Sequence, residues 1–372
     1  MRRLFSTVLA GTVAMTALVG CSQTEAPATE NTGTEATKDP EIDEEALKVA
    51  LLVPGNLGDK SFFDSANNGM QLIEEQLGAE IKVVEMGVDQ TKWEPTVLDF
   101  SDQDWDIIIS GMWDMTPVLN EVAELYPDNH YINFDTSDET VAENVYAMFY
   151  KTNELSFLAG SLAALQAEAA GSDTIGFIGG MDNPGINDFL IGYIEGAQYI
   201  NPDIKVATSY AGSFVDATKG KEVAISMYNQ GVEIIFQVAG QTGVGIIDAA
   251  KELGKPVIGV DSDQTLAFME SDPEKANSIV SSALKKVDEA ILRAVKLHEE
   301  GTLPYGTHET LGLPEGVVGL AKNDIFKEKV SAENQAKLDE VEAAVVAGEV
   351  TVSTAFGLTT EEIAARRDAV RP

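Results

Sequence analysis

Cys21 is the single cysteine of this 372-residue chain, and the chain has only three histidines. One thiol cannot form an intrachain disulfide, and His130, His298 and His308 do not stand at metal-ligand spacing. The sequence contains no phosphate-binding loop, nucleophile elbow, H-E-x-x-H helix or dinucleotide fingerprint. The residue types therefore predict no catalytic centre, no metal site and no cofactor, and His308 is predicted to be solvated.

Two glycine-rich stretches are the best places for a ligand to meet the backbone. Gly179–Gly185 and Gly240–Gly245 each follow an apolar run and precede a helical pattern, without the spacing of a nucleotide-binding loop. Each is either a tight strand-to-helix turn or such a turn whose amides also face a bound ligand. Gly240 is therefore a candidate binding residue.

The charge balance excludes several partners. The chain has 25 Lys and Arg against 61 Asp and Glu, which gives a formal net charge of −36. Such a surface repels nucleic-acid phosphates and anionic lipid headgroups. We expect no nucleic-acid partner and no membrane contact through the protein surface itself.

Residues 1–20 are predicted to be a cleaved signal peptide. Arg2 and Arg3 precede an apolar run that is too short for a membrane-spanning helix. The run ends in Leu-Val-Gly-Cys, which resembles the lipobox of bacterial lipoproteins, where the cysteine is joined to diacylglycerol. The resemblance implies a lipid on Cys21 and a position outside the cytoplasmic membrane, held by that anchor alone. Residues 21–45 are rich in Thr, Glu, Ala and Pro and predict a disordered tether.

From residue 47 onward, short apolar runs alternate with amphipathic stretches, and these elements must position any site. One series covers residues 47–135 and a second covers residues 174–260; their apolar runs are continuous, as in strands buried on both faces. The pattern predicts an α/β protein with two doubly wound lobes and a ligand cleft at the carboxyl ends of the strands. We assign residues 46–147 and 276–305 to the N-terminal lobe, and residues 148–275 and 306–372 to the C-terminal lobe.

Two strand-to-helix passages, at residues 144–167 and 278–298, are predicted to cross between the lobes. The tail after residue 311 is predicted to add a strand near residues 316–320 and helices at residues 332–347 and 360–369.

Several short motifs carry a resemblance to a known family. They are Gly58-Asp59-Lys60-Ser61-Phe62, Ser156-Phe157-Leu158-Ala159-Gly160, Ile175-Gly176-Phe177-Ile178-Gly179-Gly180, Gly212-Ser213-Phe214-x-Asp216, Gly259-Val260-Asp261-x-Asp263-Gln264 and Leu284-Lys285-Lys286-Val287-Asp288. In their order and spacing the chain resembles the basic membrane protein family of substrate-binding lipoproteins, which includes purine nucleoside receptors of ABC importers. The resemblance covers residues 47–297 and implies a type I periplasmic-binding fold, with two Rossmann-like lobes that close on a ligand about a hinge.

The resemblance also implies a binding site. In the nucleoside-binding members, aromatic rings from the two lobes hold the base, and a carboxylate and a lysine hold the ribose hydroxyls. The matching positions here are Phe62, Phe214, Asp261 and Lys285. Without the resemblance, the two phenylalanines are more typical of core packing, Asp261 of a turn or cap, and Lys285 of a solvated helix residue.

The sequence departs from the nucleoside receptors where the edge of the base is expected. Asn56 lies in Leu52-Val53-Pro54-Gly55-Asn56-Leu57-Gly58, where those receptors carry V-T-D, and Phe63 stands in place of an asparagine. Trp113, at a strand-to-helix turn, is either a packing residue or a further aromatic wall. With Asp59 these residues complete the predicted site. A modified nucleoside, a free base or a flavin remains an alternative to an ordinary purine nucleoside.

We expect a monomer that captures a small molecule and presents it to an ABC permease driven by a cytoplasmic ATPase. One alternative is a surface lipoprotein that senses ligand and signals to a partner. A nucleoside hydrolase is a third hypothesis, which the missing nucleophile and metal motifs disfavour.

Overall fold

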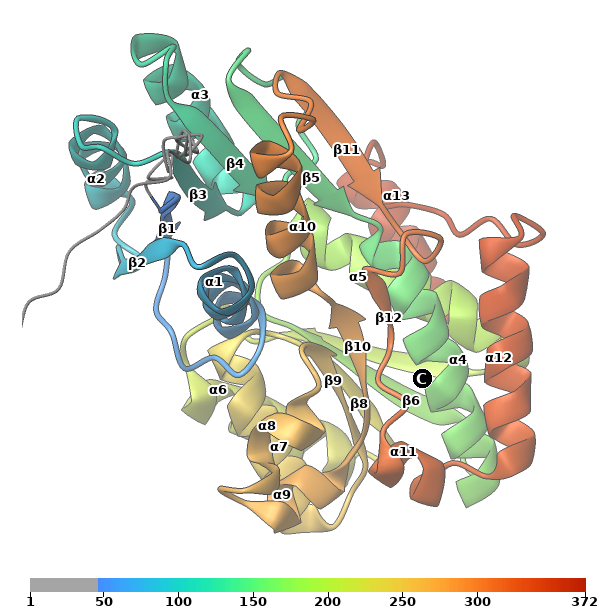
Figure 1. The fold of residues 1–372 in the computed structure, drawn as a ribbon. Helices are drawn as coiled ribbons and strands as arrows, with labels where there is room; N and C mark the ends of the chain where they lie inside the picture. The colour runs from blue at the N-terminus through green and yellow to red at the C-terminus, as the bar shows by residue number, and fades with distance from the viewer. Residues whose placement is uncertain (1–45) are drawn as a thin grey trace, which may run out of the picture. The chain divides into compact units, whose positions relative to one another are not determined.

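Two six-stranded sheets organise residues 46–372, the part of the chain that the computed structural model describes (Figure 1). The first sheet has the order β11-β5-β4-β3-β1-β2, and its strand pairs are parallel. Its strands are β1 (Lys48–Val53), β2 (Glu80–Glu85), β3 (Ile107–Gly111), β4 (His130–Phe134), β5 (Val145–Tyr150) and β11 (Thr307–Leu311). The predicted signal peptide, Cys21 and the tether lie outside the described residues.

The second sheet has the order β12-β10-β9-β8-β6-β7. Its strands are β6 (Thr174–Gly179), β7 (Lys205–Tyr210), β8 (Ile235–Val238), β9 (Val257–Asp261), β10 (Ile279–Lys285) and β12 (Val318–Leu320). Only β12 runs antiparallel to its neighbour, β10, among the strands of this sheet. The two parallel sheets confirm the predicted α/β class and the two doubly wound lobes.

Helices cover both faces of the first sheet. The helices of this lobe are α1 (Phe62–Leu77), α2 (Trp93–Ser101), α3 (Thr116–Leu125) and α10 (Val287–Glu299), with 3₁₀ turns η1 (Gln90–Lys92) and η2 (Trp113–Met115). Leu51 of β1 packs in the same core cluster as Ile73 of α1, whereas its neighbour Leu52 packs with Val97 of α2 and Leu119 of α3. Because successive strand residues point to opposite faces, a strand covered on both sides is apolar at every position.

The second sheet is also covered on both faces. Its helices are α4 (Thr152–Ala170), α5 (Pro184–Ile200), α6 (Ala217–Asn229), α7 (Gln241–Leu253), α8 (Gln264–Met269), α9 (Pro273–Ser278), α11 (Asp324–Lys329), α12 (Ala332–Val346) and α13 (Thr360–Ala369). Helices α4 and α5 pack against each other closely, and glycines make this possible. A Cβ at Gly196 would lie 1.9 Å from the carbonyl oxygen of Phe157, so no larger residue fits there.

The chain crosses between the sheets three times. The first crossing joins β5 to α4, the second joins β10 to α10, and the third joins β11 to β12. The first two lie in the passages that the sequence predicted, and the third was not predicted. The predicted tail elements are present as β12, α12 and α13, and α12 packs on α4 while α13 packs on α5.

The sheet order corrects the predicted lobe boundaries. Strand β10 falls in the range 276–305 that was assigned to the N-terminal lobe, yet it pairs with β9 in the second sheet. Strand β11 falls in the range 306–372 that was assigned to the C-terminal lobe, yet it pairs with β5 in the first sheet. In each case the strand belongs to the lobe that the chain is about to leave, and the crossing comes only after it. The chain therefore passes from one lobe to the other at residues 150–152, 285–287 and 311–318.

Among the helices of residues 46–372, none has the length and apolar character needed to cross a membrane.

Candidate functional site

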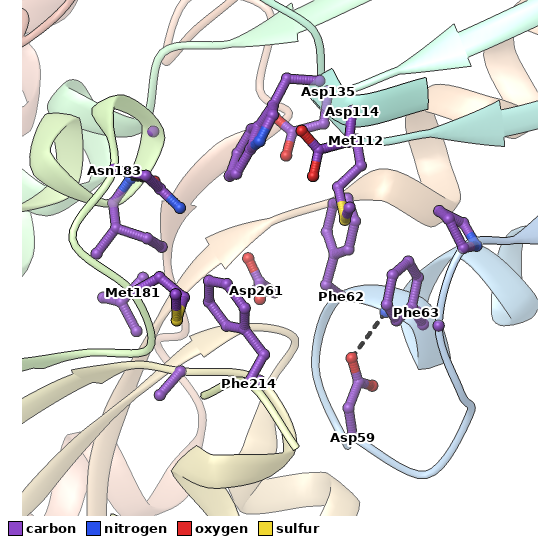
Figure 2. A pocket seen from close by; sticks show the side chains of 18 of the residues that line it. Asp59, Phe62, Phe63, Met112, Asp114, Asp135, Met181, Asn183, Phe214 and Asp261 are labelled. Atoms are coloured by element: carbon purple, nitrogen blue, oxygen red, sulfur yellow. Dashed lines mark hydrogen bonds between the residues drawn. The ribbon is translucent and has the colours of Figure 1, made fainter. Parts of the chain in front are cut away.

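A cavity of about 440 Å³ lies between the lobes, where the carboxyl ends of strands from both sheets meet (Figure 2). This volume falls within the range of small-molecule sites. Helix α7 begins at Gly240, which has a positive φ of 54°, and Gly240 lines the cavity. All nine predicted binding residues line it: Asn56, Asp59, Phe62, Phe63, Trp113, Phe214, Gly240, Asp261 and Lys285.

A buried ionic cluster made of Lys285, Asp135 and Asp261 forms one part of the cavity wall. These residues stand at the ends of β10, β4 and β9, and each is less than 9% exposed. The Nζ atom of Lys285 lies 2.9 Å from Oδ2 of Asp135 and 3.6 Å from Oδ1 of Asp261. It also lies 4.3 Å from the centre of the Phe62 ring, a cation–π distance. The cluster therefore places a donor and two acceptors beside an aromatic ring.

Burial and charge act together on the cluster. Burial by itself disfavours the lysine charge, but the carboxylates of Asp135 and Asp261 outweigh it and raise the pKa of Lys285. Burial raises the pKa of Asp261, with Lys285 and the Ser61 hydroxyl acting in the opposite direction. One lysine faces two carboxylates, so the cluster retains acceptor capacity for hydroxyl or amine donors of a ligand.

Backbone strain gathers at this site. Among the described residues, the non-glycine residues with positive φ are Lys60, Met112, Asp135 and Asp261, with φ between 55° and 88°. Met112, Asp135 and Asp261 line the cavity, and Lys60 precedes the start of α1. Such conformations each cost about 1–3 kcal/mol and persist where the surrounding structure enforces them, most often at functional sites.

Asp59 fixes the loop that leads into α1. Its carboxylate accepts hydrogen bonds from the backbone amides of Ser61 at 3.0 Å, Phe63 at 2.9 Å and Asp64 at 3.1 Å. Burial raises its pKa to about 6, and the three amide hydrogen bonds oppose that rise. Asp59 lines the cavity, but its oxygens are engaged by the chain, so its structural role is to hold Phe62 and Phe63 in place.

Three aromatic rings in the cavity lie on glycines. The ring atoms of Phe63, Trp113 and Phe214 come within 2.6 Å of where a Cβ would stand on Gly55, Gly185 and Gly180, respectively. Figure 2 shows Phe62 and Phe63 on one side of the cavity and Phe214 with Met181 on the other. Only glycine allows a ring to rest this close to the backbone, so the glycine turns support aromatic platforms.

Direct hydrogen bonds join the lobes at the start of α1. The Ser61 hydroxyl donates to Oδ2 of Asp261, and the Ser262 hydroxyl donates to the carbonyl oxygen of Ser61 at 3.0 Å. The side-chain amide of Gln264 donates through Nε2 to the carbonyl oxygen of Lys60 at 3.0 Å. The ring of Trp113, from the first lobe, meanwhile contacts Gly185 of the second lobe. The cleft is closed in this structure.

Several lining residues were not predicted from sequence. Asp135 and the aromatic residues Phe149, Phe189 and Phe356 line the cavity together with Met112 and Met181. Asp135 follows a buried strand as Asp261 does, and that signal was available in the sequence. His308, predicted to be solvated, is partly buried, and its Nε2 donates to the carbonyl oxygen of Thr136 at 2.8 Å. The reason is that β11 joins the first sheet beside β5.

Metal coordination is not supported by the described side chains, because no group of three or more His, Cys, Asp or Glu residues among them is arranged to hold an ion.

Comparison with known proteins agrees with this geometry. A family model described as ABC transporter substrate-binding protein PnrA-like matches residues 46–352. Basic membrane protein A of Borreliella burgdorferi is 32% identical over 313 residues, covering 83% of this chain and 88% of that protein. The ABC transporter nucleoside-binding protein BmpA of Lactococcus lactis is 30% identical over 325 residues, covering 82% of this chain and 89% of that protein.

A solved structure shares the fold. The crystal structure of an ABC transporter system solute-binding protein from Aeropyrum pernix K1 superposes with a TM-score of 0.74 at 26% identity, covering 87% of this chain and 99% of that chain.

Proposed function

Because the chain belongs to the PnrA-like family of ABC transporter substrate-binding proteins, we propose that its interlobe cavity captures a flat heterocyclic ligand, in the first instance a purine nucleoside. Capture involves no covalent chemistry: the lobes close on the ligand and present a closed surface to an ABC permease. The observation that carries the proposal is the buried ionic cluster of Lys285, Asp135 and Asp261 beside the rings of Phe62 and Phe214.

The cluster suits the hydroxyls of a sugar ring. A hydroxyl both donates and accepts, so it is able to bond a carboxylate and an ammonium group at once. Lys285 already lies 3.6 Å from Asp261, a separation that a ligand hydroxyl can bridge. Phe62 and Phe214 offer faces for a flat base, and stacking is tolerant of the base's identity.

The charges around the cavity favour a ligand without a phosphate. Lys285 is the one basic residue among the described lining residues, whereas the acidic ones are Asp59, Asp114, Asp135, Asp182 and Asp261. A phosphate would meet net repulsion there. The ring of Phe63 on Gly55 adds an apolar surface where the nucleoside receptors carry polar groups, which keeps a modified nucleoside, a free base or a flavin as alternative ligands.

The proposal places the protein outside the cytoplasmic membrane. The lipobox-like sequence before Cys21 supports anchoring by a lipid on that cysteine, with the tether of residues 21–45 between anchor and body. Mass spectrometry of the protein purified from membranes tests this anchor. Diacylglycerol on an N-terminal Cys21 is expected, and an unmodified or uncleaved N-terminus would contradict it.

The first experiment is a thermal-unfolding screen of residues 46–372, which form one unit. The test ligands are purine and pyrimidine nucleosides, free bases, riboflavin and simple sugars. A ligand that binds only the folded state raises the midpoint. A shift with purine nucleosides supports the proposal, a shift with riboflavin or a base alone reassigns the ligand, and no shift with any of them contradicts it.

The aromatic contact is tested by Phe62→Ala. Loss of one aromatic–base stack, worth about 1–3 kcal/mol, is expected to weaken binding at least tenfold. Tyr199→Ala is the matched control, because Tyr199 is 52% exposed on α5 and does not line the cavity. Equal affinity of Phe62→Ala and the unchanged protein would remove Phe62 from the site.

Transport and sensing are separated by a deletion. Removing the gene of an importer's receptor is expected to abolish ligand uptake at low concentration, whereas removing a sensor leaves uptake intact.

A further inference from the structure

A short segment near the C-terminus, residues 353–358, reaches the cavity from outside the family match. The matched residues end at residue 352, yet Phe356 lines the cavity and its ring centre lies 5.2 Å from that of Phe149, edge to face. We call residues 353–358 the strap. Phe149 belongs to β5 of the first lobe, so the strap places an aromatic residue against the first lobe's part of the wall.

The strap is tied to the second lobe by a buried carboxylate. Asp188 of α5 is fully buried, and it accepts hydrogen bonds from the Thr354 hydroxyl and from the Ala355 amide at 2.9 Å. The same side chain accepts from the Thr152 hydroxyl at 2.6 Å and the Asn153 amide at 3.0 Å, at the start of α4. One carboxylate thus joins the strap to the first crossing between the lobes.

Further contacts hold the backbone of the strap. The Ser353 amide donates to Oε2 of Glu195 at 2.9 Å, and the side-chain amide of Asn153 donates to the carbonyl oxygen of Ser353 at 3.3 Å. Ala355 is 1% exposed and packs with Ile191 of α5. A segment with this many buried anchors has a defined position in the folded protein.

A tight turn within the strap carries Phe356. The Leu358 amide donates to the carbonyl oxygen of Ala355 at 3.1 Å, which closes a four-residue turn. Gly357, with a φ of 86°, occupies its third position, where a type II turn requires a positive φ. Phe356 is therefore the second residue of the turn, and the Thr354 hydroxyl receives its amide hydrogen at 3.2 Å.

We propose that the strap is part of the binding site, and that Phe356 together with Phe149 forms an apolar subsite that selects ligands carrying an uncharged apolar or aromatic group beyond the flat ring held by Phe62 and Phe214. The subsite rests on the proposed function, because it belongs to the same cavity. The apolar subsite narrows the proposed ligands to nucleosides or other flat heterocycles with an apolar substituent, because such a substituent gains contacts that the parent nucleoside lacks.

The test compares binding of two probes, adenosine and N6-benzyladenosine, by isothermal titration calorimetry. The unchanged protein is expected to bind N6-benzyladenosine at least fivefold more tightly than adenosine, and Phe356→Ala is expected to remove this preference. Phe356→Tyr retains the ring and is expected to restore most of it. If Phe356 had a purely structural role, Phe356→Ala would weaken the binding of both probes equally, and Phe356→Tyr would not selectively restore the binding of N6-benzyladenosine.

Leu358→Ala is the matched control. Leu358 also belongs to the strap, but it packs against Ile191 and Ala355 and does not line the cavity. It is expected to leave the preference between the probes unchanged. Unfolding midpoints without ligand show whether each variant is folded, and Phe356→Leu, which retains apolar volume without a ring, replaces Phe356→Ala if that variant unfolds.

The outcomes separate the two proposals. Binding of both probes without a preference, or a preference that survives Phe356→Ala and Phe356→Leu, would overturn the strap proposal and leave the proposed function standing. Binding of neither probe by the unchanged protein would overturn the subsite, and whether the wider function also fails is read from the bases and riboflavin of the thermal screen.

Discussion

The cavity wall is made in two different ways, by the buried ionic cluster and by the strap. Asp135, Asp261 and Lys285 stand directly at the ends of three strands. Pairing of β9 with β10 brings Asp261 and Lys285 together in the second sheet, and the facing strand ends of the first sheet add Asp135. Phe356 lies on a turn more than 30 residues beyond the last strand, and Asp188 holds that turn. The difference teaches that strand ends position the charged groups, whereas a terminal segment shapes the apolar surface.

Both parts depend on buried charge, but in opposite ways. In the cluster, the charged lysine is the shared partner of two carboxylates. At the strap, the carboxylate of Asp188 is the shared acceptor for four donors that carry no formal charge. Removing the shared residue is therefore expected to harm the cluster more, because it leaves charges rather than neutral donors without a partner.

The largest effect is expected for Lys285→Met. The change leaves Asp135 and Asp261 buried beside each other without their cation, and breaking a buried ion pair costs about 3–5 kcal/mol. Denaturant unfolding measures this loss. Lys286→Met is the matched control: its side chain is one third exposed and pairs with Glu289 at the surface, so about 0–1 kcal/mol is expected. Similar losses for both variants would show that the cluster is not a stabilising unit.

A smaller effect is expected for Asp188→Ala. Two hydroxyl and two amide donors lose their acceptor, and an unsatisfied buried group costs about 1–3 kcal/mol, so we expect a loss of about 2–3 kcal/mol. Hydrogen exchange is expected to accelerate at the Ala355 amide. Glu195→Ala, on the same helix, is the control, because it removes one partly exposed anchor and is expected to cost about 1 kcal/mol or less. Unchanged exchange at Ala355 in Asp188→Ala would mean that the strap needs no carboxylate anchor.

The smallest effect is a difference in pH dependence. Burial raises the pKa of Asp188, and its four hydrogen bonds oppose the rise. The folded state therefore binds this proton more tightly than the unfolded state, whose value is about 4. The part of the stability that comes from binding this proton is complete below that value and is lost as the pH rises through the raised folded pKa, while the carboxylate continues to accept its four hydrogen bonds.

The pH prediction is measured by following unfolding free energy from pH 3 upward in the unchanged protein and in Asp188→Asn, which cannot titrate. The unchanged protein is expected to lose stability relative to the variant as the pH rises from about 4.

The lysine of the cluster behaves differently. The carboxylates outweigh burial and raise the pKa of Lys285, so its contribution persists until the pH exceeds the ordinary lysine value of about 10. For Asp188, the prediction is contradicted if the difference in unfolding free energy between the unchanged protein and Asp188→Asn does not change with pH, or changes in the opposite direction.

The candidate residues were predicted from sequence in two ways, some by family resemblance and others, such as Gly240 and Trp113, by local pattern alone. All nine predicted residues line one cavity, because each stands at the end of a strand, in the loop that follows it or in the first turn of the next helix. Asp59 shows the limit of that reasoning. Its position predicted a ligand contact, but its carboxylate is engaged by three backbone amides.

Residues paired over long separations escaped prediction. Lys285 meets Asp135, 150 residues away, and the Thr354 hydroxyl meets Asp188, 166 residues away. Neither pairing has a local signal, because an aspartate after a strand or in a helix looks the same with or without a partner. His308 was predicted to be solvated for the same reason, since the pairing of β11 with β5 is not visible in its neighbours.

The sequence by itself determined the class of the fold, the alternation of strands and helices, the absence of catalytic motifs and four of the eight aromatic residues that line the cavity. These features depend on side-chain period, turn residues and helix caps, which act over a few neighbouring residues. Only the tertiary structure decided the lobe boundaries, the partners of Lys285 and the position of Phe356. Those features depend on which strand ends and segments meet after the chain has crossed three times between the sheets, and contacts of that range leave no periodic signal in the sequence.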